Sequence, residues 1–90
     1  MPQPNLVILI HGLHQAAFVM RPLAKRLQAR GFDTHQFGYR SMRDDIKTNS
    51  ARLNTWLESH HRPDQPIDLV GHSLGGLIIR DFVAHYPQWQ

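Results

Sequence analysis

Ninety residues, of which 41% are hydrophobic and 19% charged, allow one soluble globular domain with a modest core and exclude a disordered or fibrous chain. The sequence has no cysteine, which excludes disulfides and thiolate metal sites. The formal net charge is +3; we interpret its cluster of cations as a solvated helix face and expect no nucleic-acid binding, since no aromatic residue lies among Arg21, Lys25, Arg26 and Arg30.

The chain begins with a short apolar segment that predicts a buried strand. Residues 1–5 contain no basic residue, and the apolar run Leu6–Ile10 is too short for a signal peptide or a membrane span. We therefore expect a cytoplasmic location and no membrane span. Because this run shows no alternation of polar and apolar residues, both of its faces need cover, which favours the centre of a parallel sheet. A loop is predicted over 11–14.

The next predicted elements are a helix over about 20–30 and a strand over 32–39. Gly31 directly follows the last turn of the helix, where glycine is a common stop signal. The basic residues of the helix form i,i+4 pairs that are expected to point outward. An apolar stripe is predicted to face the sheet, formed by Leu23, Ala24 and Leu27.

A second helix is predicted to begin at Asp44 or Asp45, because a carboxylate is favourable at the positive N-terminal end of a helix. It is expected to end near His60 and His61, ahead of a proline-containing connector. Its core stripe is predicted to comprise Ile46, Leu53, Trp56 and Leu57. A third strand over 67–70 and a helix over 74–83 complete the chain.

Strands and helices therefore alternate, which predicts a parallel sheet with right-handed crossovers and helices on its faces. The last helix is unusual, because its apolar residues cover an arc of roughly 240°, whereas a surface helix needs a stripe only somewhat over 100° wide. A three-stranded sheet leaves part of such an arc uncovered. The sequence thus predicts further neighbours for this helix.

The segment Gly71–Gly76 places a serine between the third strand and the last helix. Strand, tight turn and helix with a serine at the apex is the layout of a nucleophile elbow. Small residues at Gly71 and Gly75 would let the strand and the helix approach closely around Ser73. A G-x-S-x-G pentapeptide arises by chance in a few per cent of chains of this length. The alternative is a glycine-rich turn with an ordinary exposed serine.

Gly71-His72-Ser73-Leu74-Gly75-Gly76, with His11-Gly12 after a buried first strand, resembles the α/β-hydrolase superfamily, and most closely its lipase, esterase and thioesterase-like members. The resemblance covers residues 6–87. It implies an α/β fold, a three-layer sandwich with a parallel sheet. Residues 1–90 would form a single, partial α/β-hydrolase domain, truncated after the helix that follows the elbow.

The resemblance also implies roles for individual residues. Ser73 would be the nucleophile of a serine hydrolase that cleaves carboxylic esters or thioesters through an acyl-enzyme. The backbone N–H groups of Leu13 and Leu74 would form the oxyanion hole, which stabilises the charge that develops on the attacked carbonyl. The residues expected to support the motif are His11, Gly12, Gly71, His72 and Gly75. A small-molecule ester or thioester is the implied substrate, and neither a cofactor nor a metal is implied.

The sequence departs from the family where the catalytic acid and histidine are expected. In the family these two residues follow the nucleophile in the chain. The only aspartate after Ser73 is Asp81, and the only histidine is His85. Both lie in or at the end of the predicted last helix and are expected to point away from the serine. We therefore expect the chain alone to be inactive. A base supplied by His11 or His14 in the oxyanion loop is a less favoured alternative, and a metal bound there is less favoured still.

A second function remains open on the sequence alone. The family's strand order places the first strand between the other two, so the third strand would be an open edge. An open edge invites pairing with another chain. In this alternative the protein is a non-catalytic remnant or binding module that self-associates through its exposed sheet edge. The residues do not identify the substrate or the acyl-chain preference.

Overall fold

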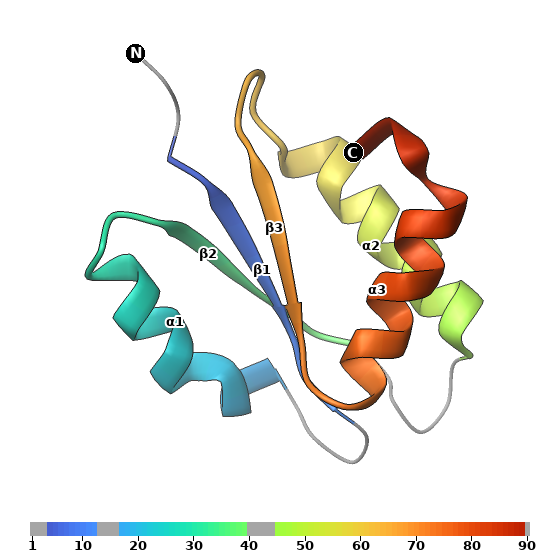
Figure 1. Cartoon of the computed structure of the whole chain (residues 1–90), viewed down its shortest axis with the longest axis horizontal. Helices are drawn as coiled ribbons and strands as arrows, with labels where there is room; N and C mark the ends of the chain where they lie inside the picture. Colours follow the sequence, from blue (N-terminus) through green and yellow to red (C-terminus); the bar gives the residue numbers. More distant parts are fainter. Residues whose placement is uncertain (1–3, 13–16, 40–44, 90) are drawn as a thin grey trace.

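The computed structural model describes residues 4–12, 17–39 and 45–89 of the chain. These residues form an α/β fold in which a three-stranded parallel sheet lies between two layers of helices (Figure 1). The predicted fold class is confirmed. The elements, in chain order, are β1 (Leu6–Ile10), η1 (Ala17–Met20), α1 (Arg21–Gln28), β2 (Asp33–Phe37), α2 (Ile46–His60), β3 (Ile67–Gly71), α3 (Leu74–His85) and η2 (Pro87–Trp89).

The apolar strand β1 lies at the centre of the sheet, as its sequence predicts. The strand order is β2-β1-β3, and Leu6 pairs with Asp33 on one side and with Ile67 on the other. All five residues of β1 are buried. Both faces of the strand are covered by helices, so every position can be apolar.

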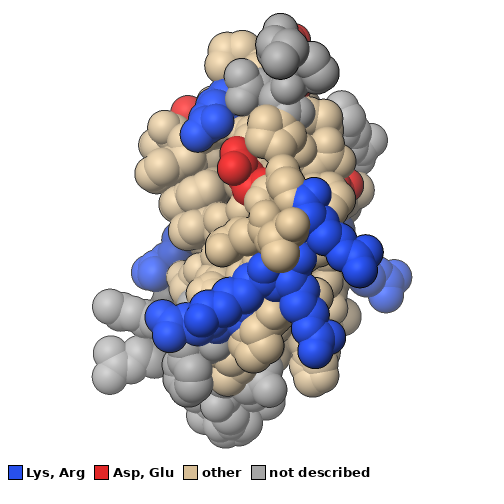
Figure 2. All heavy atoms as spheres, turned by 90° about the vertical axis from the view of Figure 1, so that its left-hand side faces the viewer, with Lys and Arg blue, Asp and Glu red and all other residues tan. Residues whose placement is uncertain are grey.

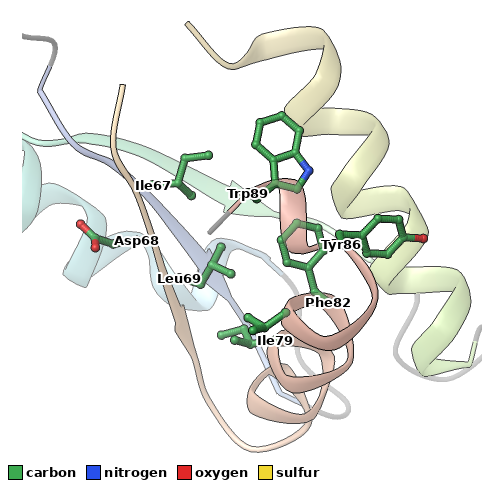
Figure 3. Close-up of a pocket in the computed structure, with 8 residues that line it drawn as sticks. Ile67, Asp68, Leu69, Ile79, Phe82, Tyr86 and Trp89 are labelled. Carbon is green, nitrogen blue, oxygen red and sulfur yellow. The ribbon is translucent and has the colours of Figure 1, made fainter. Parts of the chain in front are cut away.

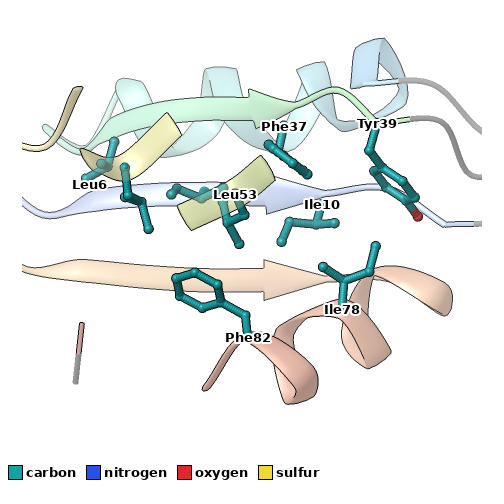
Figure 4. Packing of buried hydrophobic residues seen from close by; sticks show 9 residues of the cluster. Leu6, Ile10, Phe37, Tyr39, Leu53, Ile78 and Phe82 are labelled. Carbon is teal, nitrogen blue, oxygen red and sulfur yellow. The ribbon is translucent and has the colours of Figure 1, made fainter. Parts of the chain in front are cut away.

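Alternate residues of β1 face different helical layers. Val7 and Leu9 pack with Ala24 of α1, beside Met20, Leu27 and Phe32. The opposite face packs against α2 and α3, which lie side by side in Figure 1. Figure 4 shows that larger cluster, in which side chains of β1 and Phe37 at the end of β2 meet side chains of the two helices. Its most buried members are Leu6, Ile8, Ile10, Phe37, Leu53, Leu57, Ile78 and Phe82.

Three predicted boundaries and contacts differ in detail. The predicted helix over 20–30 is α1 preceded by the 3₁₀ turn η1, and the predicted strand over 32–39 is the shorter β2. Leu23 was expected to face the sheet, but this prediction is wrong, because its side chain is 38% exposed. Phe32 takes a place in this cluster instead, beyond the turn after α1. The chain enters that turn through Gly31, whose φ of 92° suits glycine.

Helix α2 begins and packs largely as expected. Asp45 is its N-cap, and its carboxylate accepts a 2.8 Å hydrogen bond from the Thr48 N–H, which lowers the pKa of Asp45. The predicted stripe is partly confirmed, since Leu53 and Leu57 are buried whereas Ile46 and Trp56 are only half-buried. The polar residues Asn49 and Ser50 are also buried on this helix, which its apolar pattern does not predict.

The wide apolar arc of α3 is only partly covered in the structure. Ile78 and Phe82 are fully buried against the sheet, but Leu77 is 48% exposed and Val83 40% exposed. β3 is an edge strand, and Val70 on it is 39% exposed. Across the described part of the chain, every helix is too short or too polar to cross a bilayer.

Candidate functional site

Ser73 lies in the turn between β3 and α3, at the carboxyl ends of the strands. Its backbone has φ 56° and ψ −116°, a combination that L-residues rarely adopt. Such conformations cost about 1–3 kcal/mol and persist only where the surrounding structure imposes them. The side chain makes no capping hydrogen bond to α3, and the residue is exposed. The hydroxyl is therefore presented to solvent on a strained turn.

Two glycines allow the strand, the turn and the helix to approach closely. A Cβ atom on Gly71 would lie 2.6 Å from the Gly75 carbonyl carbon and 2.7 Å from the Gly76 nitrogen. A Cβ atom on Gly75 would lie 2.9 Å from the His11 carbonyl oxygen and closer still to that of Ile10. All of these neighbours are backbone atoms, which have little freedom to move. Glycine is therefore required at both positions for the observed turn.

Backbone hydrogen bonds fix the turn against the central strand. The His72 N–H donates to the Ile10 carbonyl over 3.0 Å, which extends the pairing of β3 with β1. The Gly75 and Gly76 N–H groups donate to the carbonyls of His72 and Ser73 over 3.0 and 2.9 Å. His72 thus contributes through its backbone, while its side chain is exposed. These bonds hold Ser73 in place although its conformation is unfavourable.

Leu74 is the first residue of α3, so its N–H is one of the groups that have no acceptor within the helix. Within residues 4–12, 17–39 and 45–89, no hydrogen bond from this N–H is found. It lies directly after Ser73 at the positive end of the helix dipole. This N–H can therefore donate to an anion. Leu13, the other expected donor, and His14 lie outside the described residues.

His11 and Gly12 lie at the end of β1, and both are buried. The His11 Nδ1 is 3.0 Å from the Gly12 carbonyl oxygen; this oxygen can only accept, so Nδ1 carries the proton. The His11 Nε2 is buried without a partner among the described residues. Its ring stacks on Tyr39 with a centroid distance of 4.2 Å. His11 is thus part of the packing beneath the turn.

Tyr39 is a supporting residue that the sequence did not reveal, because it was expected only as the last residue of the strand predicted over 32–39. Its hydroxyl donates a 2.7 Å hydrogen bond to the His11 carbonyl. Burial raises the pKa of Tyr39, so the hydroxyl stays protonated and able to donate. An aromatic residue two positions after a strand was the only signal available. The bond joins the end of β2 to the end of β1 below Ser73.

No described histidine forms a hydrogen bond with Ser73. His60 bonds to the Trp56 carbonyl in the last turn of α2, and His61 bonds to the Gln65 carbonyl in the connector before β3. His85 Nδ1 lies 3.3 Å from Asp81 Oδ1 on the last turns of α3, so these two residues face each other. The ring of His35 on β2 stacks on the ring of Trp56 on α2, with the two ring centroids 3.8 Å apart. Among the described residues, the structure therefore brings the serine and the Leu74 N–H together without a base.

No cluster of three or more metal-ligating side chains exists in the described part of the chain. An apolar hollow lies away from Ser73, beside β3 and the second half of α3 (Figure 3). It has a volume of about 290 Å³ and is lined mainly by apolar side chains. Ile67 and Leu69 point into it from the strand, whereas Asp68 points to the other face of the sheet. The remaining lining residues are Ile79, Phe82, Val83, Tyr86 and Trp89.

Comparison with known proteins gives one family. The family model described as "Putative serine esterase (DUF676)" matches residues 2–89, which is nearly the whole chain. No curated protein and no solved structure shows significant similarity to the chain.

Proposed function

The chain belongs to the serine esterase family that its sequence matches, and on this premise we propose that Ser73 is the nucleophile of a carboxylic ester or thioester hydrolase. The observation that carries the proposal is the backbone of Ser73, with φ 56° and ψ −116° in a turn fixed by one hydrogen bond to β1 and two within the turn. A structural serine has no need of so unfavourable a conformation. A catalytic serine requires this conformation, because the strained turn holds its hydroxyl above the sheet.

In the proposed reaction the Ser73 oxygen attacks the carbonyl carbon of the ester, and its proton passes to a base. The carbonyl oxygen becomes an oxyanion that accepts hydrogen bonds from the N–H groups of Leu74 and Leu13. Collapse of the tetrahedral intermediate expels the alcohol or thiol, which takes up a proton from the base. Water then hydrolyses the acyl-enzyme and releases the acid. Supporting roles fall to His11, Gly12, Gly71, His72 and Gly75.

The base is the missing group among the described residues. Removing a general base typically lowers a rate 10²–10⁴-fold, because a serine hydroxyl is a weak nucleophile at neutral pH. Asp81 and His85 are engaged with each other, so they do not activate Ser73. We therefore propose that residues 1–90 on their own hydrolyse esters at least about 10²–10⁴-fold more slowly than a serine hydrolase with a complete triad. The reaction as proposed uses no cofactor, and the absence of cysteine supports a reducing compartment such as the cytoplasm.

Labelling of the intact gene product with a fluorophosphonate probe tests the proposal. The probe forms a covalent bond with an activated serine oxygen, so one label per molecule is expected, on Ser73. Ser73→Ala should remove the label, whereas Ser59→Ala, which removes an exposed serine from α2, should retain it. Absence of labelling in the intact protein, or labelling that survives Ser73→Ala, would refute the assignment.

One observation favours a second function, a module that self-associates through the edge of its sheet. β3 is paired only with β1 among the described strands, and the apolar groove runs alongside it. Val70, Leu77 and Val83, which are 39–48% exposed, lie on the same strand and helix. An unpaired strand beside apolar surface is a template for a second copy. Sedimentation would then show a dimer that Val83→Lys dissociates; a monomer at all concentrations would exclude this function.

A further inference from the structure

The outer face of α1 carries a concentration of positive charge. Arg21, Lys25, Arg26 and Arg30 are all exposed on this helix or directly after it. The sequence contains no aspartate or glutamate before Asp33, although it has seven acidic residues in total. Figure 2 shows Lys and Arg side chains gathered in a band across this side of the molecule.

The cations on α1 are not neutralised by the fold. None of them forms an ion pair with a carboxylate in the described parts of the chain, and Asp33 is engaged by Arg62 at 3.7 Å. Within α1 the like charges of Arg21 and Lys25, four positions apart, repel each other instead, and Arg26 and Arg30 add further positive charge. The fold gains nothing from this arrangement. An anionic partner would relieve the repulsion.

Aliphatic side chains lie among these cations on the same face. Val19 in η1 and Leu23 in α1 are each 38% exposed, and Leu23 and Arg26, three positions apart, form a short stripe along α1 that Arg30 follows in the turn after the helix. Leu23, Arg26 and Arg30 also line a shallow hollow on the surface of α1. The stripe therefore offers apolar and cationic groups to the same partner.

From these observations we infer that the outer face of α1 docks on the surface of an anionic lipid bilayer. A helix that lies in a bilayer interface combines cations for the lipid phosphates with aliphatic side chains that enter the boundary of the acyl chains. Nucleic acid would satisfy the charges but would leave Val19 and Leu23 in water, and no described aromatic side chain on this face can stack on a base.

The position of α1 suits an esterase that works at such a surface. β1 leads into η1 and α1 from its carboxyl end, and the turn that carries Ser73 lies at that same end of the sheet (Figure 1). The start of α1 and the serine therefore share one end of the molecule. Lipid esters in the bilayer become the expected substrates, a consequence that rests on the proposed function, whereas the docking itself does not depend on Ser73.

Flotation of the protein with vesicles tests the inference. Vesicles of phosphatidylcholine with 30 mol% phosphatidylserine should bind the protein, and vesicles of phosphatidylcholine alone should bind it far less. Each cation near an anionic surface contributes roughly fivefold in affinity, so Arg26→Gln/Arg30→Gln should weaken binding on the order of 30-fold. The matched variant Lys47→Gln/Arg80→Gln removes the same charge from exposed positions on α2 and α3 and should bind normally. At 1 M salt the Debye length falls to about 3 Å and binding should be lost.

Two further arms separate lipid from other partners. Leu23→Ser should weaken vesicle binding and leave the far-ultraviolet circular dichroism unchanged, because Leu23 is already 38% exposed. Ser73→Ala should bind vesicles as well as the unmodified protein, so loss of esterase activity alone does not bear on docking. Equal weakening by the two double variants would overturn the inference. Binding of duplex DNA at least as tight as that of the anionic vesicles, unaffected by Leu23→Ser, would also overturn it and assign the face to nucleic acid.

Discussion

Two adjacent glycines at the start of α3 are expected to respond in opposite ways to the same substitution. In Gly75→Ala the new Cβ would meet backbone atoms of β1, including the His11 carbonyl oxygen at 2.9 Å and the Ile10 carbonyl carbon at 3.0 Å. In Gly76→Ala the Cβ would meet nothing within 4 Å. The pair therefore isolates the close approach of α3 to β1.

The magnitude follows from two terms. Alanine is favoured over glycine in a helix by up to about 1 kcal/mol, and this gain is similar for the two variants. Only Gly75→Ala must also push α3 away from β1, and overpacking of this kind costs about 1–3 kcal/mol. We expect Gly76→Ala to raise the free energy of unfolding, and Gly75→Ala to lie about 1–3 kcal/mol below it.

Thermal unfolding followed by circular dichroism measures the difference. A change of 1 kcal/mol shifts the Tm of a domain of 60–100 residues by about 4–8 °C, so the two variants should differ by at least about 4 °C. Each variant serves as the control for the other, since composition and helix position are nearly identical. Equal Tm values for the two variants would refute the reasoning that the turn depends on this contact.

Three further predictions concern the turn and the layers around it. Ser73→Gly should relieve the strain of φ 56° and be more stable than Ser73→Ala by about 1 kcal/mol in chemical denaturation, and equal stability would argue against stored strain. Burial, and secondarily a charge on His60, lowers the pKa of His35, so its neutral form is favoured in the folded state. Stability should accordingly be complete above the ordinary pKa near 6.5 and fall as the pH drops below it, with a smaller fall in His35→Gln; an identical pH profile for that variant would contradict the assignment. Tyr39→Phe removes the 2.7 Å hydrogen bond to the His11 carbonyl and should cost about 1 kcal/mol in urea unfolding, whereas an unchanged midpoint would show that water replaces this bond.

The sequence predicted the sheet well because local pattern and topology agree there. The unbroken apolar run of β1 has only one stable place in an alternating chain, the centre of a parallel sheet. The turn at Ser73 was equally readable, since the two flanking glycines are needed for close approach of backbone. In both cases the physical requirement lies within a few neighbouring residues.

Contacts between distant segments could not be read in the same way. Leu23 fits the apolar period of α1 but is 38% exposed, whereas Phe32, beyond the turn after α1, packs against the cluster of Val7, Leu9 and Ala24. Tyr39 reaches the His11 carbonyl across 28 positions of sequence, and no local pattern signals that bond. The wide apolar arc of α3 was predicted correctly, and Leu77 and Val83 remain exposed on it.

The central position of β1 has a consequence for how the protein is made. β1 is synthesised before β2 and β3, and Leu6 must wait for Ile67 before its second edge is paired. At about 5–20 residues per second the ribosome needs roughly 3–12 s to produce the intervening chain. Throughout that interval β1 has at least one unpaired edge. Its five aliphatic residues, without charge or proline, are of the sequence type most prone to pairing with other chains. A nascent-chain chaperone that recognises short aliphatic segments would find its binding site here, and its release would be timed by the arrival of β3.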